Sequence, residues 1–181
     1  LDKLGEEINK HNFRIRLLDS ILYFVKSFKE EYGNDIVIAM DGSSWRKDVF
    51  QYYKYKRKES RKKDKHDWKE IHKIYEELIE EFKLVLPYKF IRIEGAEGDD
   101  IIATLSRNTD EKVLIVGTDK DYLQLQLKKN ISQYSPQKGE FITATNEEIM
   151  YKMFFHIMKG DDSDGICNVL NKNDTFYKGI R

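Results

Sequence analysis

The pattern of apolar and polar positions divides the chain into alternating helical and extended segments. Residues 12–32 carry apolar side chains at helical spacing, and Gly33 is placed to cap the end of that helix. The run IVIAM at 36–40 is continuously apolar, which is typical of a strand buried on both faces. The same patterns predict further helices at 66–86, 100–107 and 146–159, and further strands at 90–93, 113–116 and 131–134.

This alternation of helices and strands predicts an α/β fold with a mostly parallel central sheet flanked by helices. A chain of 181 residues can hold one domain with a sizeable core, or one domain with an arm. The sequence starts at Leu1 and not at Met, directly in a charged segment, so we expect a fragment or a processed product.

Composition narrows the class of protein. Charged residues make up 35% of the chain and hydrophobic residues 40%, as in a soluble globular protein with a very polar surface. Cys167 is the one cysteine, so we expect no disulfide framework and a reducing, cytoplasmic setting. No apolar run approaches the roughly 18 residues of a membrane helix, so we expect no membrane partner. We also expect a monomer.

Acidic side chains follow each apolar run. In open α/β sheets, ligands bind beyond the carboxyl ends of the strands, and these ends share one edge if the sheet is parallel. The stretch EGAEGDD at 94–100 is the densest example, with four carboxylates in seven residues. The strand ends and the loop after the last helix together supply Asp41, Glu94, Glu97, Asp99, Asp100, Asp119, Asp121, Asp161 and Asp164.

Carboxylates gathered without compensation would be pushed toward their neutral forms, because like charges repel. Divalent cations resolve this conflict, and hard oxygen ligands suit Mg²⁺ or Mn²⁺. Two such ions about 4 Å apart can bracket a phosphodiester, one activating water and the other stabilising the leaving oxygen. A single aspartate at a strand end is usually only a solvated loop residue, but four separate acidic clusters favour a metal site.

The segment 45–65 is basic and aromatic, with ten Lys/Arg and three acids between Arg46 and Lys65. A helix with a solvated charged face is the commoner origin of a bare charge run. Aromatic side chains among cations, however, suit single-stranded nucleic acid, where bases stack and phosphates pair. Lys54 and Arg57 would share a helix face, where they could steady a scissile phosphate. The other side chains expected to bind nucleic acid are Arg46, Lys47, Tyr52, Tyr53, Lys56, Lys58 and Arg61.

Other motifs fail on spacing. GDDSDG at 160–165 begins like a calcium loop, but the twelfth position counted from Asp161 is Lys172 and not an acid. The four histidines and Cys167 lack zinc-site spacing, and there is no phosphate-binding P-loop. An aspartate-nucleophile phosphatase would need D-x-D after the first strand, where this chain reads DGS.

Five motifs in order, MDG, YKYKR, EGAEGDD, TDKDY and KGDDSDG, resemble those of the 5′-nuclease (flap endonuclease) superfamily. The stretch from Trp45 to Arg57 and the sequence HIMKGD resemble most the ribonuclease H-type 5′-exonucleases of T-even-like phages. Each motif alone is weak, but together they cover nearly the whole chain. The resemblance implies a 5′-nuclease catalytic domain at 1–165 with a helical arch at 45–65, and the start of a truncated helix–three-turn–helix and C-terminal region at 166–181.

The resemblance also implies a role for each matching residue. Lys54 and Arg57 match the basic pair that contacts the scissile phosphate at the base of the arch. The implied ligands of a first metal are Asp41, Glu97 and Asp99, with Asp100 supporting them. The implied ligands of a second metal are Asp119, Asp121, Asp161 and Asp164.

The implied activity is 5′→3′ exonuclease and flap endonuclease cleavage of DNA and RNA–DNA hybrids, as in primer removal during replication. It would use two Mg²⁺ ions, which Mn²⁺ can replace. The substrates would carry a 5′ flap or a single-stranded 5′ end, and a single-strand-binding protein or a clamp is a candidate partner. The setting would be the cytoplasm of a bacterium or of a phage-infected host.

Two departures from the superfamily leave alternatives open. The superfamily begins with a short strand that carries a further metal-binding aspartate, and this chain starts after that point. Gly165 stands where the family usually has Asn, and the chain stops soon after GDDSDG. One alternative is therefore a nucleic-acid-binding remnant that no longer cuts. Another is a PIN-type ribonuclease, although the long basic arch argues against it.

Overall fold

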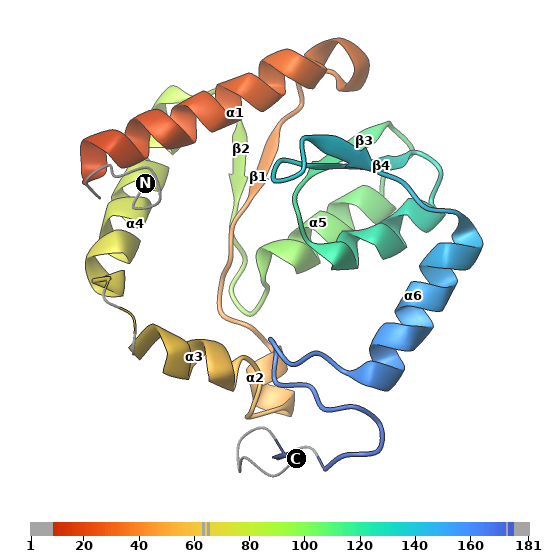
Figure 1. The fold of residues 1–181 in the computed structure, drawn as a ribbon. Helices are drawn as coiled ribbons and strands as arrows, with labels where there is room; N and C mark the ends of the chain where they lie inside the picture. Colours follow the sequence, from red (N-terminus) through yellow and green to blue (C-terminus); the bar gives the residue numbers. More distant parts are fainter. Residues whose placement is uncertain (1–8, 63, 65, 173, 176–181) are drawn as a thin grey trace. The chain divides into compact units, whose positions relative to one another are not determined.

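The computed structural model describes residues 9–62, 64, 66–172 and 174–175. The chain divides into two compact units, one drawn from residues 1–38 and 65–91 and the other from residues 39–64 and 92–181. Figure 1 shows the helices and strands in chain order, with colours that run along the sequence. All the residues predicted to do chemistry belong to the second unit.

The first unit is built mainly from two helices and two short strands. Helix α1 (Lys10–Tyr32) ends at Gly33, which adopts a φ of 82° that a glycine tolerates without steric cost. Strands β1 (Val37–Ala39) and β2 (Lys89–Ile91) form a two-stranded sheet. Helix α4 (Trp68–Val85) leads into β2 and begins at Asp67, whose side chain accepts hydrogen bonds from the first backbone N–H groups.

Helices α1 and α4 are joined by ion pairs on their exposed faces. Lys10 pairs with Glu77 and Arg14 with Glu81, each at 2.6 Å. Exposed pairs of this kind contribute little to stability. The packing of α4 depends instead on its apolar face, where the buried residues are Ile74, Leu78, Ile79 and Phe82.

The second unit contains a three-stranded sheet in the order β3-β4-β5. Strands β3 (Val113–Val116) and β4 (Ile131–Ser135) are parallel, and β5 (Glu140–Ile142) pairs with β4 in the antiparallel sense. Helix α5 (Gly98–Arg107) precedes β3, and a 3₁₀ helix, η2 (Lys120–Leu127), follows it. The buried core of this sheet consists of Ile115, Leu125 and Ile131, with Ile102, Ala103, Val113 and Tyr122 packed against it.

Two short helices and one longer helix complete the second unit. Helices α2 (Arg46–Val49) and α3 (Tyr55–Lys62) occupy the basic aromatic segment. Helix α6 (Asn146–Lys159) begins with a reciprocal capping box and ends at Gly160. An added Cβ at Gly160 would lie 2.4 Å from the carbonyl oxygen of Ile166, so only glycine fits this turn into the acidic loop, which we define as residues 161–166.

The α/β class is confirmed, and every predicted helix and strand has a counterpart. Two elements were not predicted, namely η2 (Lys120–Leu127) and β5 (Glu140–Ile142). Strand β5 makes part of the sheet antiparallel, because it follows β4 through a tight turn and not through a crossover helix. Within the part of the chain that the structure describes, no helix is both long enough and apolar enough to span a membrane.

Candidate active site

Asp41 follows β1 and fastens the first turn of α5. Its Oδ1 accepts a hydrogen bond from the backbone N–H of Gly98 at 2.8 Å. An added Cβ at Gly98 would lie 3.2 Å from that oxygen, and one at Gly42 would lie 2.3 Å from the carbonyl oxygen of Ile93. These glycines therefore allow Asp41 to reach the positive end of the helix dipole, which favours a carboxylate there.

Glu97, the N-cap of α5, is the most buried acid of the site, with 8% of its surface exposed. Its carboxylate accepts hydrogen bonds from Lys54 Nζ at 2.6 Å and from the Tyr53 hydroxyl at 2.7 Å. Burial pushes the pKa of Glu97 upward, but the hydrogen bonds from Lys54 and Tyr53 outweigh it and lower the pKa. Burial and the bond to Glu97 raise the pKa of Tyr53. Glu97 is therefore ionised and paired at neutral pH.

Asp100 is held by a different set of donors. Arg46 grips both of its oxygens, through Nη2 at 2.7 Å and Nη1 at 2.8 Å, and the N–H of Glu97 donates to Oδ2 at 3.0 Å. The Arg46 hydrogen bond lowers the pKa of Asp100, and the same bond raises the pKa of Arg46. Bidentate pairs of this kind are strong and directional, so Asp100 ties α2 to α5.

Asp99, Asp119 and Asp121 form the acidic centre of the site. The Tyr122 hydroxyl donates to Oδ1 of Asp99, and the N–H of Asp121 donates to Oδ1 of Asp119 at 2.9 Å. Desolvation raises the pKa of Asp99, and the charges of Asp119 and Asp41 raise it further. Desolvation and the charge of Asp119 likewise raise the pKa of Asp121. The centre therefore carries more negative charge than its surroundings balance.

The acidic loop brings Asp161 to the same place. Its Oδ1 accepts from the N–H of Ser163 at 2.8 Å and from the Ser163 hydroxyl at 2.6 Å. Its Oδ2 accepts from Lys120 Nζ at 2.8 Å and lies 3.6 Å from Nε2 of His156. Burial pushes the pKa of Asp161 upward, but the bonds from Lys120 and Ser163 outweigh it and lower the pKa.

The acidic loop also touches the start of α3. Arg57 pairs with Asp164 at 2.6 Å, and the N–H of Lys54 donates to the carbonyl oxygen of Asp164 at 2.8 Å. Gly165 adopts a φ of 76°, and an added Cβ there would lie 2.8 Å from the carbonyl oxygen of Tyr52. Glycine at 165 thus lets the two backbones approach closely.

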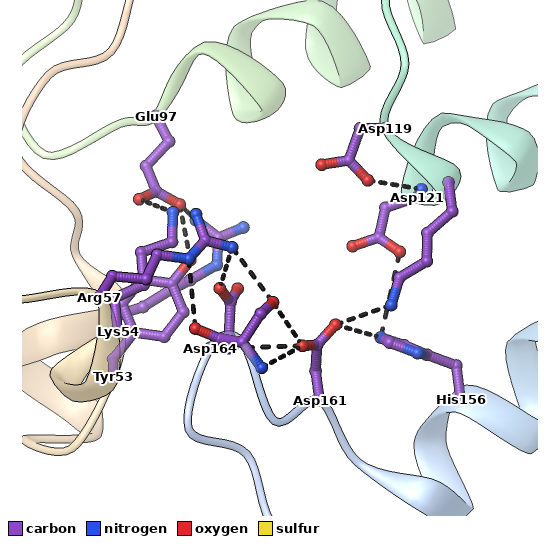
Figure 2. A network of polar contacts seen from close by, with 12 residues as sticks. Tyr53, Lys54, Arg57, Glu97, Asp119, Asp121, His156, Asp161 and Asp164 are labelled. Atoms are coloured by element: carbon purple, nitrogen blue, oxygen red, sulfur yellow. Dashed lines mark hydrogen bonds and ion pairs between the residues drawn. The ribbon is translucent and has the colours of Figure 1, made fainter. Parts of the chain in front are cut away.

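Most of these side chains line one cavity. Figure 2 shows site residues that come from the starts of α3 and α5, from η2 and from the acidic loop, with His156 of α6 beside Asp161. Of the eight predicted metal-binding carboxylates, those in its lining are Glu97, Asp99, Asp100, Asp119, Asp121, Asp161 and Asp164. Asp41 lies beside them, since its charge acts on Asp99. Among the described residues, no three Asp, Glu, His or Cys side chains are arranged to hold a metal ion. Lys54, Arg57 and Lys120 occupy carboxylate oxygens instead.

The residues predicted to bind nucleic acid separate into three groups. Arg46 and Tyr53 line the cavity, where they contact acids. Lys56 and Arg61 line a shallower depression together with Arg57 and the acidic loop, and Lys56 pairs there with Asp162. The remaining predicted side chains lie outside both hollows and are Lys47, Tyr52 and Lys58.

Four residues of the site were not predicted, and they are Lys120, Tyr122, Gln133 and His156. Lys120 and Tyr122 belong to the motif TDKDY, so their closeness in sequence to Asp119 and Asp121 was a usable signal. Gln133 is a buried polar residue of β4, with 2% of its surface exposed, and its amide donates to the carbonyl oxygens of Gly117 and Asp119. His156 was discounted because the histidines lack zinc-site spacing, although it lies on the predicted helix before the acidic loop.

Comparison with known proteins places the chain in a family. Residues 6–164 match the 5′-3′ exonuclease, N-terminal resolvase-like domain, and the chain therefore belongs to this family. The match spans both units and ends inside the acidic loop, so it includes every residue of the candidate active site.

Curated relatives of the chain are named as nucleases. It is 30% identical to ribonuclease H of Enterobacteria phage T4 over 181 residues, covering 97% of this chain and 59% of the relative. It is also 30% identical to a 5′-3′ exonuclease of Mycoplasmopsis pulmonis, covering 94% of this chain and 58% of the relative. The chain thus spans less than two thirds of the length of these relatives.

Solved structures share the fold. A flap endonuclease of bacteriophage T5, crystallised with DNA and metal ions, matches with a TM-score of 0.71 and 20% identity, covering 99% of this chain and 70% of that one. The T5 5′-exonuclease with bound zinc matches with a TM-score of 0.68 and 23% identity, covering 95% and 69% of the two chains. These neighbours establish the 5′-nuclease fold for this chain.

Proposed function

We propose that this domain cleaves phosphodiester bonds at the 5′ end of nucleic acid, as the catalytic part of a 5′→3′ exonuclease and flap endonuclease. The observation that carries the proposal is the cavity in which the carboxylates of three separate segments face Lys54 and Arg57. An acidic centre beside fixed cations suits a reaction on a polyanion that needs divalent metal. Membership of the 5′-3′ exonuclease family supports the same conclusion.

The donor set fits divalent cations. Oxygen ligands are those that Mg²⁺ and Mn²⁺ prefer, and the raised pKa values of Asp99 and Asp121 indicate excess negative charge that a cation would balance. We infer two cations, which would supply Lewis acidity for activating water and for stabilising the leaving oxygen. The residues to hold the first are Asp41, Glu97 and Asp99, and those to hold the second are Asp119, Asp121, Asp161 and Asp164.

In our proposal, Asp100 supports this site but does not itself bind a cation. Arg46 donates to both of its carboxylate oxygens, and Oδ2 also accepts the capping hydrogen bond from the N–H of Glu97. Its role would be to hold the first turn of α5, from which Glu97 and Asp99 extend. Positioning contacts of this kind commonly change metal affinity by about 10–100-fold when removed.

Lys54 and Arg57 would stabilise the charge that develops on the phosphoryl oxygens during cleavage. Both are cations in the cavity lining, and both are paired with acids, Lys54 with Glu97 and Arg57 with Asp164. Each can exchange its carboxylate for a phosphate oxygen without moving to another part of the site. Preorganised cations at a reacting centre are typically worth about 10²–10³ in rate.

The segment 45–65 would guide a single-stranded 5′ end toward the cavity. Its lysines and arginines offer phosphate contacts, and the exposed side chain of Trp45 offers a surface on which a base can stack. Substrates with a 5′ flap, and RNA–DNA hybrids with a free 5′ end, fit this arrangement. A single-strand-binding protein or a clamp remains a candidate partner of the whole protein.

Cleavage of a 5′-labelled flap DNA and of a nicked RNA–DNA duplex, each in Mg²⁺ and in Mn²⁺, tests the proposal. The chain would be compared with its Asp119→Asn/Asp121→Asn double variant. Asp110→Asn is the matched control, since the Asp110 side chain is fully exposed and lies outside the cavity. We expect metal-dependent cutting by the chain and by the control, and a loss of at least about 10³-fold in the double variant.

A second candidate function is nucleic-acid binding without cleavage. It is favoured by one observation: four acids of the site are paired with lysine or arginine, and among the described residues no three possible ligands are arranged for a metal. Salt-sensitive flap binding with no cutting in either metal would support this candidate against the first. Absence of both cutting and binding would contradict both.

A further inference from the structure

Tyr122 contacts the acidic centre from the first turn of η2. Its hydroxyl donates a hydrogen bond to Oδ1 of Asp99, on the neighbouring helix α5. The other well-held acids of the site are bound by charged donors, as Glu97 is by Lys54 and Asp161 is by Lys120. Tyr122 is neutral, so it fixes a carboxylate without cancelling its charge.

The ring of Tyr122 is itself held in place. It packs against the buried core of Ile115, Leu125 and Ile131. On another side it lies against Gly117, where an added Cβ would stand 2.7 Å from Cε2 of the ring. A glycine at the end of β3 therefore makes room for the ring, and the ring in turn has little freedom to withdraw its hydroxyl from Asp99.

A neutral donor suits a group that must bind a cation. A lysine or arginine bound to the Asp99 carboxylate would compete with a metal cation, because its own positive charge would neutralise the carboxylate. The Tyr122 hydroxyl instead occupies one carboxylate oxygen and leaves the full negative charge of Asp99. A tyrosine hydroxyl has an ordinary pKa of about 10 and therefore keeps its proton at neutral pH. Hydrogen bonds to metal-binding groups orient them and raise metal affinity.

We propose that Tyr122 is a positioning residue that fixes Asp99 for binding a divalent cation. The inference rests on the proposed function, because it takes the cavity to be a cation site. It adds a residue of η2 to the support of an acid on α5. It also explains the glycine at position 117, because a larger residue there would clash with the tyrosine ring beside the acidic centre.

Mn²⁺ binding measured by calorimetry, without substrate, tests the inference. Tyr122→Phe keeps the ring and removes only the hydroxyl, and we expect it to weaken Mn²⁺ binding about 10-fold. Tyr134→Phe is the matched control, because Tyr134 lies on β4 of the same unit and outside the cavity. We expect this control to bind Mn²⁺ as the unchanged chain does.

A double-variant comparison separates positioning from a general loss of structure. In the Asp99→Asn background, Tyr122→Phe should change Mn²⁺ affinity less than about 2-fold, because the hydroxyl acts through the Asp99 carboxylate. Equal binding by the unchanged chain and Tyr122→Phe would overturn the inference alone. A full further 10-fold loss in the Asp99→Asn background would also overturn it. Failure of the unchanged chain to bind Mn²⁺ would overturn the inference together with the proposed function.

Discussion

Lys54 is bound to Asp164 through the backbone, since its N–H donates to the Asp164 carbonyl oxygen at 2.8 Å. Its ammonium group meanwhile pairs with Glu97 at 2.6 Å. Lys54 has a φ of 55°, a left-handed conformation that costs a non-glycine residue about 1–2 kcal/mol. The main chain thus fixes this residue beside the acidic loop independently of its side chain, so that replacing the side chain tests the cation alone.

Lys54→Ala should therefore slow cleavage far more than it weakens binding. We expect kcat to fall about 100-fold, because the lost cation would stabilise charge mainly in the transition state. The Kd for a flap substrate should rise less than about 3-fold. Single-turnover cleavage and fluorescence anisotropy measure the two quantities separately. Arg57→Ala should behave in the same direction.

Lys58→Ala is the matched control for Lys54→Ala. Lys58 lies one turn further along α3, is exposed, and is not part of the cavity lining. We expect it to weaken binding slightly and to reduce the salt dependence of binding by about one counterion, with kcat unchanged. Equal losses of rate and affinity in Lys54→Ala would contradict the role assigned to Lys54.

Arg46→Lys should destabilise the second unit although it keeps the charge. Lysine cannot reproduce the two parallel hydrogen bonds that Arg46 makes to Asp100, and the pair is mostly shielded from water. We expect a loss of about 1–2 kcal/mol in the free energy of unfolding, measured by urea denaturation. Lys47→Ala, at the exposed neighbouring position, is the control and should change it by less than about 0.5 kcal/mol.

Asp121→Asn should stabilise the protein in the presence of a chelator. Desolvation and the charge of Asp119 raise the pKa of Asp121, so its ionised form opposes folding when no cation is bound. Because the side chain is 51% exposed, solvent screening keeps the gain below about 1 kcal/mol. Thermal denaturation in EDTA measures it, with Asp110→Asn as control. A lower Tm for Asp121→Asn than for the control would contradict the prediction.

Stability should respond to pH in two opposite ways. Glu97 and Asp100 have pKa values below their ordinary 4.5 and 3.8, so the stability they contribute is present above those values and lost as the pH falls through the lower folded pKa values. Asp99 and Asp121 have pKa values raised above 3.8, so the folded state binds these protons more tightly, and acidification relieves their repulsion. Metal-free urea denaturation should show a slight gain in stability as the pH falls toward the raised pKa values of Asp99 and Asp121, and a loss as the pH falls below the ordinary 4.5 and 3.8 of Glu97 and Asp100. A steady loss beginning near pH 7 would be the contrary result.

Gln133→Leu should weaken both the fold and the site. Its amide donates to the carbonyl oxygens of Gly117 at 3.0 Å and Asp119 at 2.8 Å, and leucine would leave both without this donor. We expect a loss of about 1–3 kcal/mol in the free energy of unfolding, because buried acceptors without partners are costly. Gln137→Leu, in the exposed turn between β4 and β5, is the control. Equal stability of the two variants would count against the role of Gln133.

The strand ends and their acids were predictable because burial leaves a clear apolar run, and each run stops where an acid begins. The positions of Asp119 and Asp121 after β3 follow directly from this pattern. The resemblance assigned different roles to Asp99 and Asp100, but no local pattern in the sequence showed which groups each would contact. Successive residues on a helix point about 100° apart, so Asp99 meets Tyr122 while Asp100 meets Arg46.

Contacts between distant segments were not predictable, because no local pattern records them. The bond from Tyr122 to Asp99 joins two helices, and the pair between Lys120 and Asp161 joins η2 to the acidic loop. The left-handed backbone conformation of Lys54 was not predictable either, because glycine or asparagine is the usual residue in that conformation. Strand β5 was missed because its three residues are too few to show alternation.

The backbone of Gly117 joins β4 to the segment that leads to Asp119 and Asp121. The N–H of Gly117 donates to the carbonyl oxygen of Tyr134 at 3.0 Å, directly beside the carbonyls that Gln133 holds. Amide hydrogen exchange at Gly117 requires this bond to open, and that opening would release the segment that carries Asp119 and Asp121. The exchange rate of this single amide would therefore report how often the acidic centre loses its arrangement, in the free protein and in the absence of any substrate.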